Sequence, residues 1–170
     1  MDEYKIFTAK KILDNRGLFS KIYNSSKILN KLKTSFKIDE ICISKNKKKL
    51  TFRGFHYQEF PNYQKKIVFC NKGKVFDYFI DLRKKSPNFL RVYKYVLSEQ
   101  NSKVIYIPQG FAHGFLTLTD KTEIIYIISG LQKKSKERGI RFNDKILKYN
   151  FPKKIKIISN RDLNFKDFKK

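Results

Sequence analysis

Only two histidines occur in the 170 residues, and both stand in surroundings that suit chemistry. His56 lies in the run 53–58 (RGFHYQ), between an arginine and a glutamine. His113 lies in 107–115 (IPQGFAHGF), where one proline and two glycines indicate a turn between strands. Imidazole takes and gives protons near neutral pH, so both side chains are candidates for acid–base catalysis. The ordinary alternative for each is a hydrogen-bonded structural histidine.

Polar and cationic side chains accompany the first histidine. Alternate side chains of a strand point to opposite faces, so His56 and Gln58 share one face. Arg53 has the wrong parity, but a bulge at Gly54 would turn it to the same side. Lys66 opens the next strand, which is otherwise apolar. The sequence therefore predicts a polar cluster on the inner face of a sheet.

The segment 108–113 has the form Pro-x-Gly-x-x-His, which is typical of the second motif of cupin barrels. In many cupins the first motif supplies His-x-His and a carboxylate to a metal ion. Here that stretch reads His56-Tyr57-Gln58, with no matched carboxylate. Catalytic metals usually have three protein ligands, so we expect no metal site.

Short strands dominate the rest of the chain. The runs 66–70 and 74–82 are separated by Asn-Lys-Gly and predict a hairpin. Further strands rich in β-branched and aromatic residues are expected at 91–97, 103–107, 114–118 and 122–128. Only 24–36 has helical spacing of its apolar residues. The predicted fold is all-β: a single cupin or jelly-roll barrel with a short N-terminal helix, one domain over 1–170.

The charge balance needs its own explanation. Lysine and arginine total 39 against 15 acidic residues, a formal net charge of +24 at pH 7. Such a charge is typical of proteins that bind nucleic acid or anionic membranes. The lysines, however, far outnumber the seven arginines, are spread along the chain, and accompany other residues with AT-rich codons. A biased genome and a solvated surface suffice, and we expect no nucleic-acid partner.

Membrane and secretory signals are missing from the sequence. No run of about 18 uncharged apolar residues occurs, so no membrane span is expected. The first residues are too charged for a signal peptide. The two cysteines, Cys42 and Cys70, are too few for a disulfide scaffold. We therefore expect a cytoplasmic protein.

Seven short segments together resemble one cupin family, the dTDP-4-dehydrorhamnose 3,5-epimerases and related epimerases of nucleoside-diphosphate (NDP) 4-keto sugars. Each segment is weak evidence alone, but their order over nearly the whole chain is specific for the family. The segments are 14–19, 53–58, 66–70, 81–87, 107–118, 142–144 and 158–162.

The resemblance implies epimerisation next to a 4-keto group, a reaction that needs neither a metal nor a redox cofactor, so we expect no cofactor. That carbonyl acidifies the flanking C–H bonds, so a base can remove a proton, a cation can stabilise the enolate, and a proton can return on the other face. The resemblance implies that His56 is the base, that Asp162 orients it, and that Lys66 lies at the keto oxygen with Arg53. The other expected substrate-binding residues are Gln58 and His113 in the same pocket, and Arg16 and Phe19, which would hold the nucleotide diphosphate from the partner subunit of a homodimer.

Three departures from the family pattern bear on specificity. The expected acid tyrosine is replaced by Leu131-Gln132, and Tyr126 lies too far upstream, which favours epimerisation at C3 only. The segment 41–43 (ICI) replaces the family's Gln-x-Asn and should remove polar contacts to the substrate. Lys21 replaces a glutamate near the base-binding aromatic residue, so the nucleotide need not be thymidine.

Other functions remain open. One is a 3,4-ketoisomerase on the same barrel, and a second is a non-catalytic cupin that binds a sugar nucleotide. A basic nucleic-acid-binding barrel is a third. The presence of His56, Asp162 and Lys66 together favours an epimerase of an NDP-4-keto-6-deoxy sugar.

Overall fold

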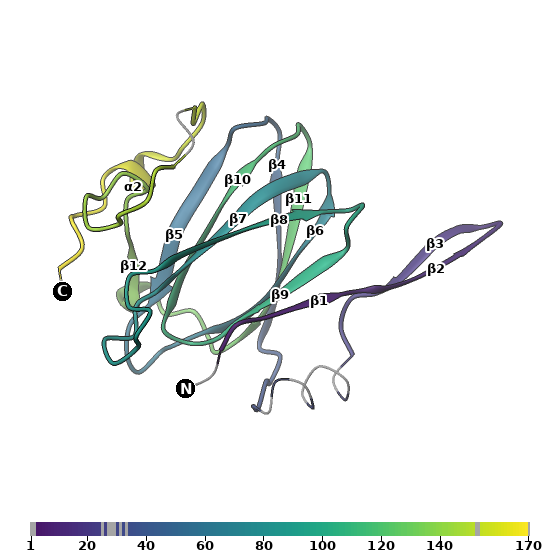
Figure 1. The fold of residues 1–170 in the computed structure, drawn as a ribbon, viewed down its shortest axis with the longest axis horizontal. Coiled ribbons are helices and arrows are strands. Elements are labelled where there is room, and N and C mark those ends of the chain that lie inside the picture. Colours follow the sequence, from purple (N-terminus) through teal and green to yellow (C-terminus); the bar gives the residue numbers. More distant parts are fainter. Residues whose placement is uncertain are drawn as a thin grey trace.

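Two antiparallel five-stranded sheets form the body of the protein (Figure 1). The computed structural model describes residues 3–24, 26, 30, 32, 34–151 and 154–169. The first sheet has the order β1 (Lys5–Thr8), β9 (Lys103–Ile107), β6 (Lys65–Lys72), β11 (Thr122–Ser129) and β4 (Glu40–Asn46). The second has the order β12 (Glu137–Gly139), β5 (Phe52–Gln58), β10 (Phe111–Thr117), β7 (Lys74–Asp81) and β8 (Val92–Ser98). This arrangement confirms the predicted jelly-roll barrel of the cupin type.

The interior between the sheets explains the alternation seen in the sequence. Val68 and Cys70 of β6 pack in one core cluster with Phe79 and Phe115 of the second sheet. Since side chains alternate along a strand, Lys66 lies on this same inward face. The predicted hairpin between β6 and β7 is present, and its Gly73 has a φ of +79°, a conformation that favours glycine.

The outer face of the first sheet carries a second apolar cluster, in which Leu32 and Phe36 cover Ile67 and Tyr106. The short N-terminal helix predicted over 24–36 is not among the described elements, because six of its thirteen residues lie outside the described residues. The helix that the structure describes, α2 (Asn160–Leu163), is near the C-terminal end instead, after the short 3-10 turn η1 (Lys134–Lys136). In the described part of the chain, no helix is long and apolar enough to cross a membrane.

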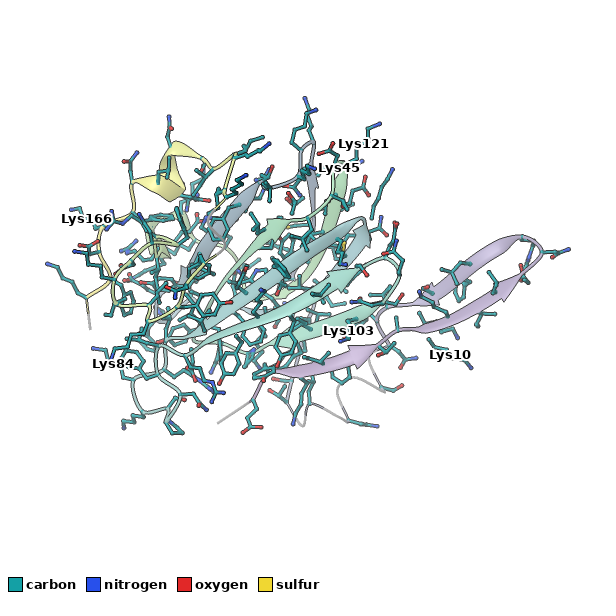
Figure 2. The ribbon with its side chains drawn as sticks, turned by 45° about the horizontal axis from the view of Figure 1, so that its top comes forward. Lys10, Lys45, Lys84, Lys103, Lys121 and Lys166 are labelled. Atoms are coloured by element: carbon teal, nitrogen blue, oxygen red, sulfur yellow. The ribbon has the colours of Figure 1, made fainter. Side chains whose placement is uncertain are left out.

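A separate hairpin, β2 (Lys10–Asp14) and β3 (Gly17–Lys21), projects away from the barrel (Figure 1). Its large apolar side chains Leu13, Leu18 and Phe19 are exposed. The lysines are spread over the surface: Figure 2 shows Lys10, Lys45, Lys84, Lys103, Lys121 and Lys166 on different sides of the molecule. This spread agrees with a solvated cationic surface.

Candidate active site

A cavity of about 230 Å³ opens between the two sheets. The wall from the first sheet includes Glu40, Cys42, Ser44, Lys66 and Tyr126. The wall from the second sheet includes Arg53, His56, Gln58, His113 and Glu137. Five residues predicted to form the site from the sequence, Lys66, Arg53, His56, Gln58 and His113, therefore come together in one cavity.

His56 forms a hydrogen-bonded pair with Asp162, whose Oδ1 lies 2.8 Å from Nε2 of the imidazole. The other carboxylate oxygen accepts a hydrogen bond of 3.1 Å from the backbone N–H of Gly54. Asp162 itself belongs to α2, and its backbone N–H donates to the side chain of Ser159, which caps that helix. The tail of the chain thus brings a carboxylate to the predicted base.

The ionised state of Asp162 suits a pair in which His56 is the base. Burial acts to raise the pKa of Asp162, but the hydrogen bond and charge of His56 and the N–H of Gly54 outweigh it. The pKa of Asp162 therefore lies below its usual range, and the carboxylate is ionised. An ionised carboxylate accepts from Nε2–H, which leaves Nδ1 of His56 as the atom that can take a proton.

His113 forms a second pair, with its Nε2 lying 2.8 Å from Oδ2 of Asp77. The two pairs differ in access, since the side chain of His56 is 32% exposed and that of His113 only 4%. The other oxygen of Asp77, Oδ1, is buried and has no hydrogen-bond partner among the described residues. The ring of Tyr126 stands edge-on to His113, with centroids 5.8 Å apart. Both histidines line the cavity, and His56 is the more accessible of the two.

Lys66 supplies a cation from the opposite wall. Loss of water around its ammonium lowers the pKa of Lys66, and the carboxylates of Glu137 and Asp77 act against this shift. Burial acts to raise the pKa of Glu137, but the hydrogen bonds from Arg161 and Gln132 have the larger combined effect. The pKa of Glu137 therefore lies below its ordinary value, and Glu137 is ionised. The cavity wall therefore holds a desolvated lysine whose charged form the carboxylates of Glu137 and Asp77 favour.

The predicted bulge at Gly54 is present. Its φ is +130°, and the pairing of β5 with β10 changes register between His113 and Phe115. A Cβ on Gly54 would lie only 2.6 Å from the Cα of Gly114, so the close approach of the two strands requires glycine. The bulge turns Arg53 into the cavity wall, where its Nε donates to Oδ1 of Asn46 over 2.9 Å.

The expected loss of polar contacts at 41–43 is wrong. Ile41 and Ile43 are 65% and 58% exposed on the outer face of β4. The alternate residues Glu40, Cys42 and Ser44 line the cavity instead. Strand parity is the reason: the inward face begins at Glu40, so polar side chains still meet the substrate space.

Tyr126 lies too far upstream to match the family's acid tyrosine, but it lines the cavity. Burial raises its pKa well above the ordinary value, so the phenol is protonated at neutral pH. At the position of the family's acid tyrosine, Leu131 is exposed and Gln132 reaches the cavity wall. The cavity thus contains a phenolic proton donor on the wall opposite His56.

Two expected binding residues lie elsewhere in this chain. Arg16 is at the turn of the β2–β3 hairpin and pairs with Asp14 over 2.7 Å. Phe19 on β3 is exposed. Neither lines the cavity of its own chain.

Three residues that sequence reasoning missed also shape the site: Asp77, Glu137 and Tyr126. Asp77 stands inside an otherwise apolar strand (VFDYFI), and this was the available signal for it. Within the described residues, no three side chains of His, Cys, Asp or Glu group together as a metal site.

Comparisons with known proteins agree with this geometry. The family model described as dTDP-4-dehydrorhamnose 3,5-epimerase matches residues 1–170. The enzyme of that name from Shigella flexneri is 36% identical over 163 residues, covering 96% of this chain and 90% of its own.

Solved structures agree as well. The crystal structure of dTDP-4-dehydrorhamnose 3,5-epimerase from Bacillus anthracis, with TDP and PPi bound, has a TM-score of 0.92 at 31% identity, covering 98% and 94% of the two chains. The dTDP-6-deoxy-D-glucose-3,5-epimerase from Legionella pneumophila, in complex with dTDP-4-keto-L-rhamnose, has a TM-score of 0.91 at 30% identity, covering 98% and 88%. The chain belongs to the dTDP-4-dehydrorhamnose 3,5-epimerase family of isomerases.

Proposed function

We propose that the chain epimerises a dTDP-linked 4-keto-6-deoxy sugar in the cytoplasm, with His56 as the general base. The observation that carries this proposal is the ionised Asp162 held 2.8 Å from His56, across the cavity from Lys66 and Tyr126. His56 removes a proton next to the keto group, and the electrons move onto the keto oxygen. Lys66 and Arg53 stabilise that oxygen as an enolate.

Inversion requires a proton from the opposite face of the sugar ring. His56 comes from the second sheet and Tyr126 from the first, so a ring bound between the walls has one group on each side. A protonated phenol is a competent donor. We therefore propose Tyr126 as the acid. The C3-only reaction was expected because Leu131-Gln132 replaces the acid tyrosine. Since Tyr126 can serve as the acid instead, we propose inversion at both C3 and C5.

The Tyr126→Phe variant tests the acid. We expect inversion to fall by about 10²-fold, because general acids contribute on that order. Proton removal by His56 persists, so in D₂O the sugar should gain deuterium with its configuration retained. NMR of dTDP-4-keto-6-deoxyglucose measures both, with Tyr57→Phe as a variant of another tyrosine at the cavity.

Each result of this experiment has a meaning. Wild-type inversion in Tyr126→Phe would exclude the phenol as the donor. Deuterium at C3 alone in the wild-type product would restore the C3-only reaction, and a 3-keto product would identify a ketoisomerase. Folded wild-type protein that exchanges no proton of any NDP-4-keto sugar would identify a non-catalytic binding protein.

The projecting hairpin supports a homodimer in which each chain completes the cavity of the other. Arg16 and Phe19 lie outside their own cavity, and the hairpin exposes Leu13, Leu18 and Phe19. A guanidinium matches a diphosphate through paired hydrogen bonds, and an aromatic ring can stack on a base. We propose that these two side chains hold the nucleotide diphosphate of the partner's substrate.

Arg16→Ala is expected to raise KM for the dTDP-sugar by about tenfold or more, because a hydrogen bond to a charged group contributes about 1.5–3 kcal/mol. Its kcat should change little. Co-expression with a His56→Asn chain provides the decisive test. In a mixed dimer, the His56 site of the Arg16→Ala chain would receive an intact hairpin, and low-substrate activity should return. If the hairpin serves its own chain, no activity returns.

A further inference from the structure

The segment 160–169 packs against the strands that carry the cavity, and Figure 1 shows it in yellow beside β5 and β12. The ring of Phe165 meets the imidazole of His56 edge-on, with centroids 5.9 Å apart and an angle of 77° between the planes. Phe165 therefore touches the predicted base directly, from a part of the chain far away in sequence.

The ring of Phe165 is seated where β12 has no side chain. Gly139 lies directly opposite His56 in the pairing of β12 with β5. A Cβ on Gly139 would overlap the ring of Phe165. The φ of Gly139 is not in the left-handed region, so backbone conformation does not require glycine there. What requires glycine is the space that the ring fills.

A second contact fixes the same segment. Nη2 of Arg161 lies 2.6 Å from Oε1 of Glu137, two residues before Gly139 on β12. The guanidinium of Arg161 also lies over the ring of Phe165, at 5.6 Å from its centroid. The ion pair and the ring contact therefore join β12 to the tail on both sides of Asp162.

The helix that bears Asp162 depends on such contacts. Its four residues are too few to form a stable helix alone, so its position comes from packing. Asp162 stands between Arg161 and Phe165 in sequence, and its carboxylate must stay within hydrogen-bond distance of His56.

We propose that Phe165, seated on Gly139, is a positioning residue that holds the imidazole of His56 and the carboxylate of Asp162 in the geometry of proton transfer. Its effect on rate rests on the proposed epimerisation, whereas its effect on the His56–Asp162 hydrogen bond does not. Phe165 acts from behind His56 and is not among the residues that line the cavity. It should therefore influence kcat more than substrate binding.

The matched control is Phe168, which lies on the same segment and is also partly buried. Its ring packs on Tyr57 at 6.4 Å, and it is not one of the rings in contact with His56. Phe165→Ala is expected to lower kcat by about 10²-fold, since small displacements of catalytic groups cost that much. KM should stay within about threefold, the pattern of a lost transition-state interaction. Phe168→Ala should leave kcat near the wild-type value.

The Gly139→Ala variant tests the same contact by changing β12 instead of the ring. The added methyl group should displace the ring of Phe165 and lower kcat as Phe165→Ala does. The double variant should be no worse than Phe165→Ala alone, because the methyl group then has no ring to displace. Additive losses would mean that Gly139 acts through something other than Phe165 and would overturn the proposal.

A measurement without substrate separates this proposal from the proposed function. The imidazole N–H proton that His56 donates to Asp162 is expected to give a downfield NMR signal, assigned by its loss in His56→Asn. The signal should be lost in Phe165→Ala and kept in Phe168→Ala, with circular dichroism showing both folded. If Phe165→Ala keeps this signal, or keeps wild-type kcat in an active enzyme, Phe165 is not a positioning residue. If the wild type is inactive but the signal behaves as expected, only the epimerase proposal fails.

Discussion

Replacing His56 by asparagine is expected to lower kcat for proton exchange next to the keto group by 10²–10⁴-fold, the usual contribution of a positioned base. The amide of asparagine cannot accept the proton at neutral pH, whereas the imidazole can. Asp162 keeps its hydrogen bond from Gly54, and the side chain of residue 56 is partly exposed. The fold should therefore survive, with a melting temperature close to that of the wild type.

The second histidine provides the contrast. Its partner Asp77 is fully buried, so His113→Leu would leave a buried carboxylate without its partner. A buried polar group that loses its hydrogen-bond partner costs about 1–3 kcal/mol, and more when the group is charged. Thermal unfolding should therefore separate the two variants: His113→Leu loses stability, whereas His56→Asn loses activity alone. Substantial solvent exchange by folded His56→Asn, followed by NMR in D₂O, would exclude His56 as the base.

Much of this site was predictable from local rules. Strand alternation placed His56 with Gln58 and put Lys66 on the inward face of its strand. The bulge predicted at Gly54 explained why the side chain of Arg53 lies in the cavity wall. These predictions needed only the pleat of a single strand and the freedom of one glycine, both of which act over a few residues.

The sequence was less informative where the position of a side chain depends on strands that are far away in the chain. Tyr126 and Cys42 are directly paired between β11 and β4, a register that one sequence does not reveal. Without it, the sequence does not show that Ile41 and Ile43 point away from the cavity, or that Tyr126 lines it. Asp77 and Glu137 are similar cases, because their roles arise from His113 and Arg161, which lie on other elements.

The role of Asp162 was hard to predict from the sequence for a different reason. In a polar tail, its side chain would ordinarily be solvated, and only family resemblance assigned it a role. The local cap of Ser159 begins its helix, but two tertiary contacts explain its burial: the N–H of Gly54 and the imidazole of His56. Neither tertiary contact follows from composition or periodicity.

Lys66→Met is expected to remove most of the activity while making the protein more stable. Loss of one charge that stabilises a developing oxyanion costs about 10²–10³-fold in kcat. Methionine has a similar shape without the ammonium, whose desolvation opposes folding. Lys65→Met is the matched control, because the neighbouring lysine donates to Thr34 and to the carbonyl of Ser35, away from the cavity. Wild-type kcat in Lys66→Met would exclude the lysine as the stabilising cation.

The difference in stability between the wild type and Lys66→Met should depend on pH. The folded-state pKa of Lys66 is lowered, so between that pKa and the ordinary value near 10.4 the unfolded chain binds more protons at this site. The stability of the wild type therefore rises with pH across this window. The advantage of Lys66→Met should be greatest at neutral pH and shrink as the pH rises, which chemical denaturation at several pH values can measure.

Activity should change with pH in the opposite direction. Only the charged ammonium stabilises an enolate, so kcat/KM should fall as the pH rises through the lowered pKa of Lys66. A bound substrate brings a negative diphosphate, and an enolate oxygen forms beside the ammonium, so both favour its charged form. The alkaline fall in kcat should therefore begin at a higher pH than the fall in kcat/KM. If both profiles fall at the same pH, the titrating group is not one that faces the substrate.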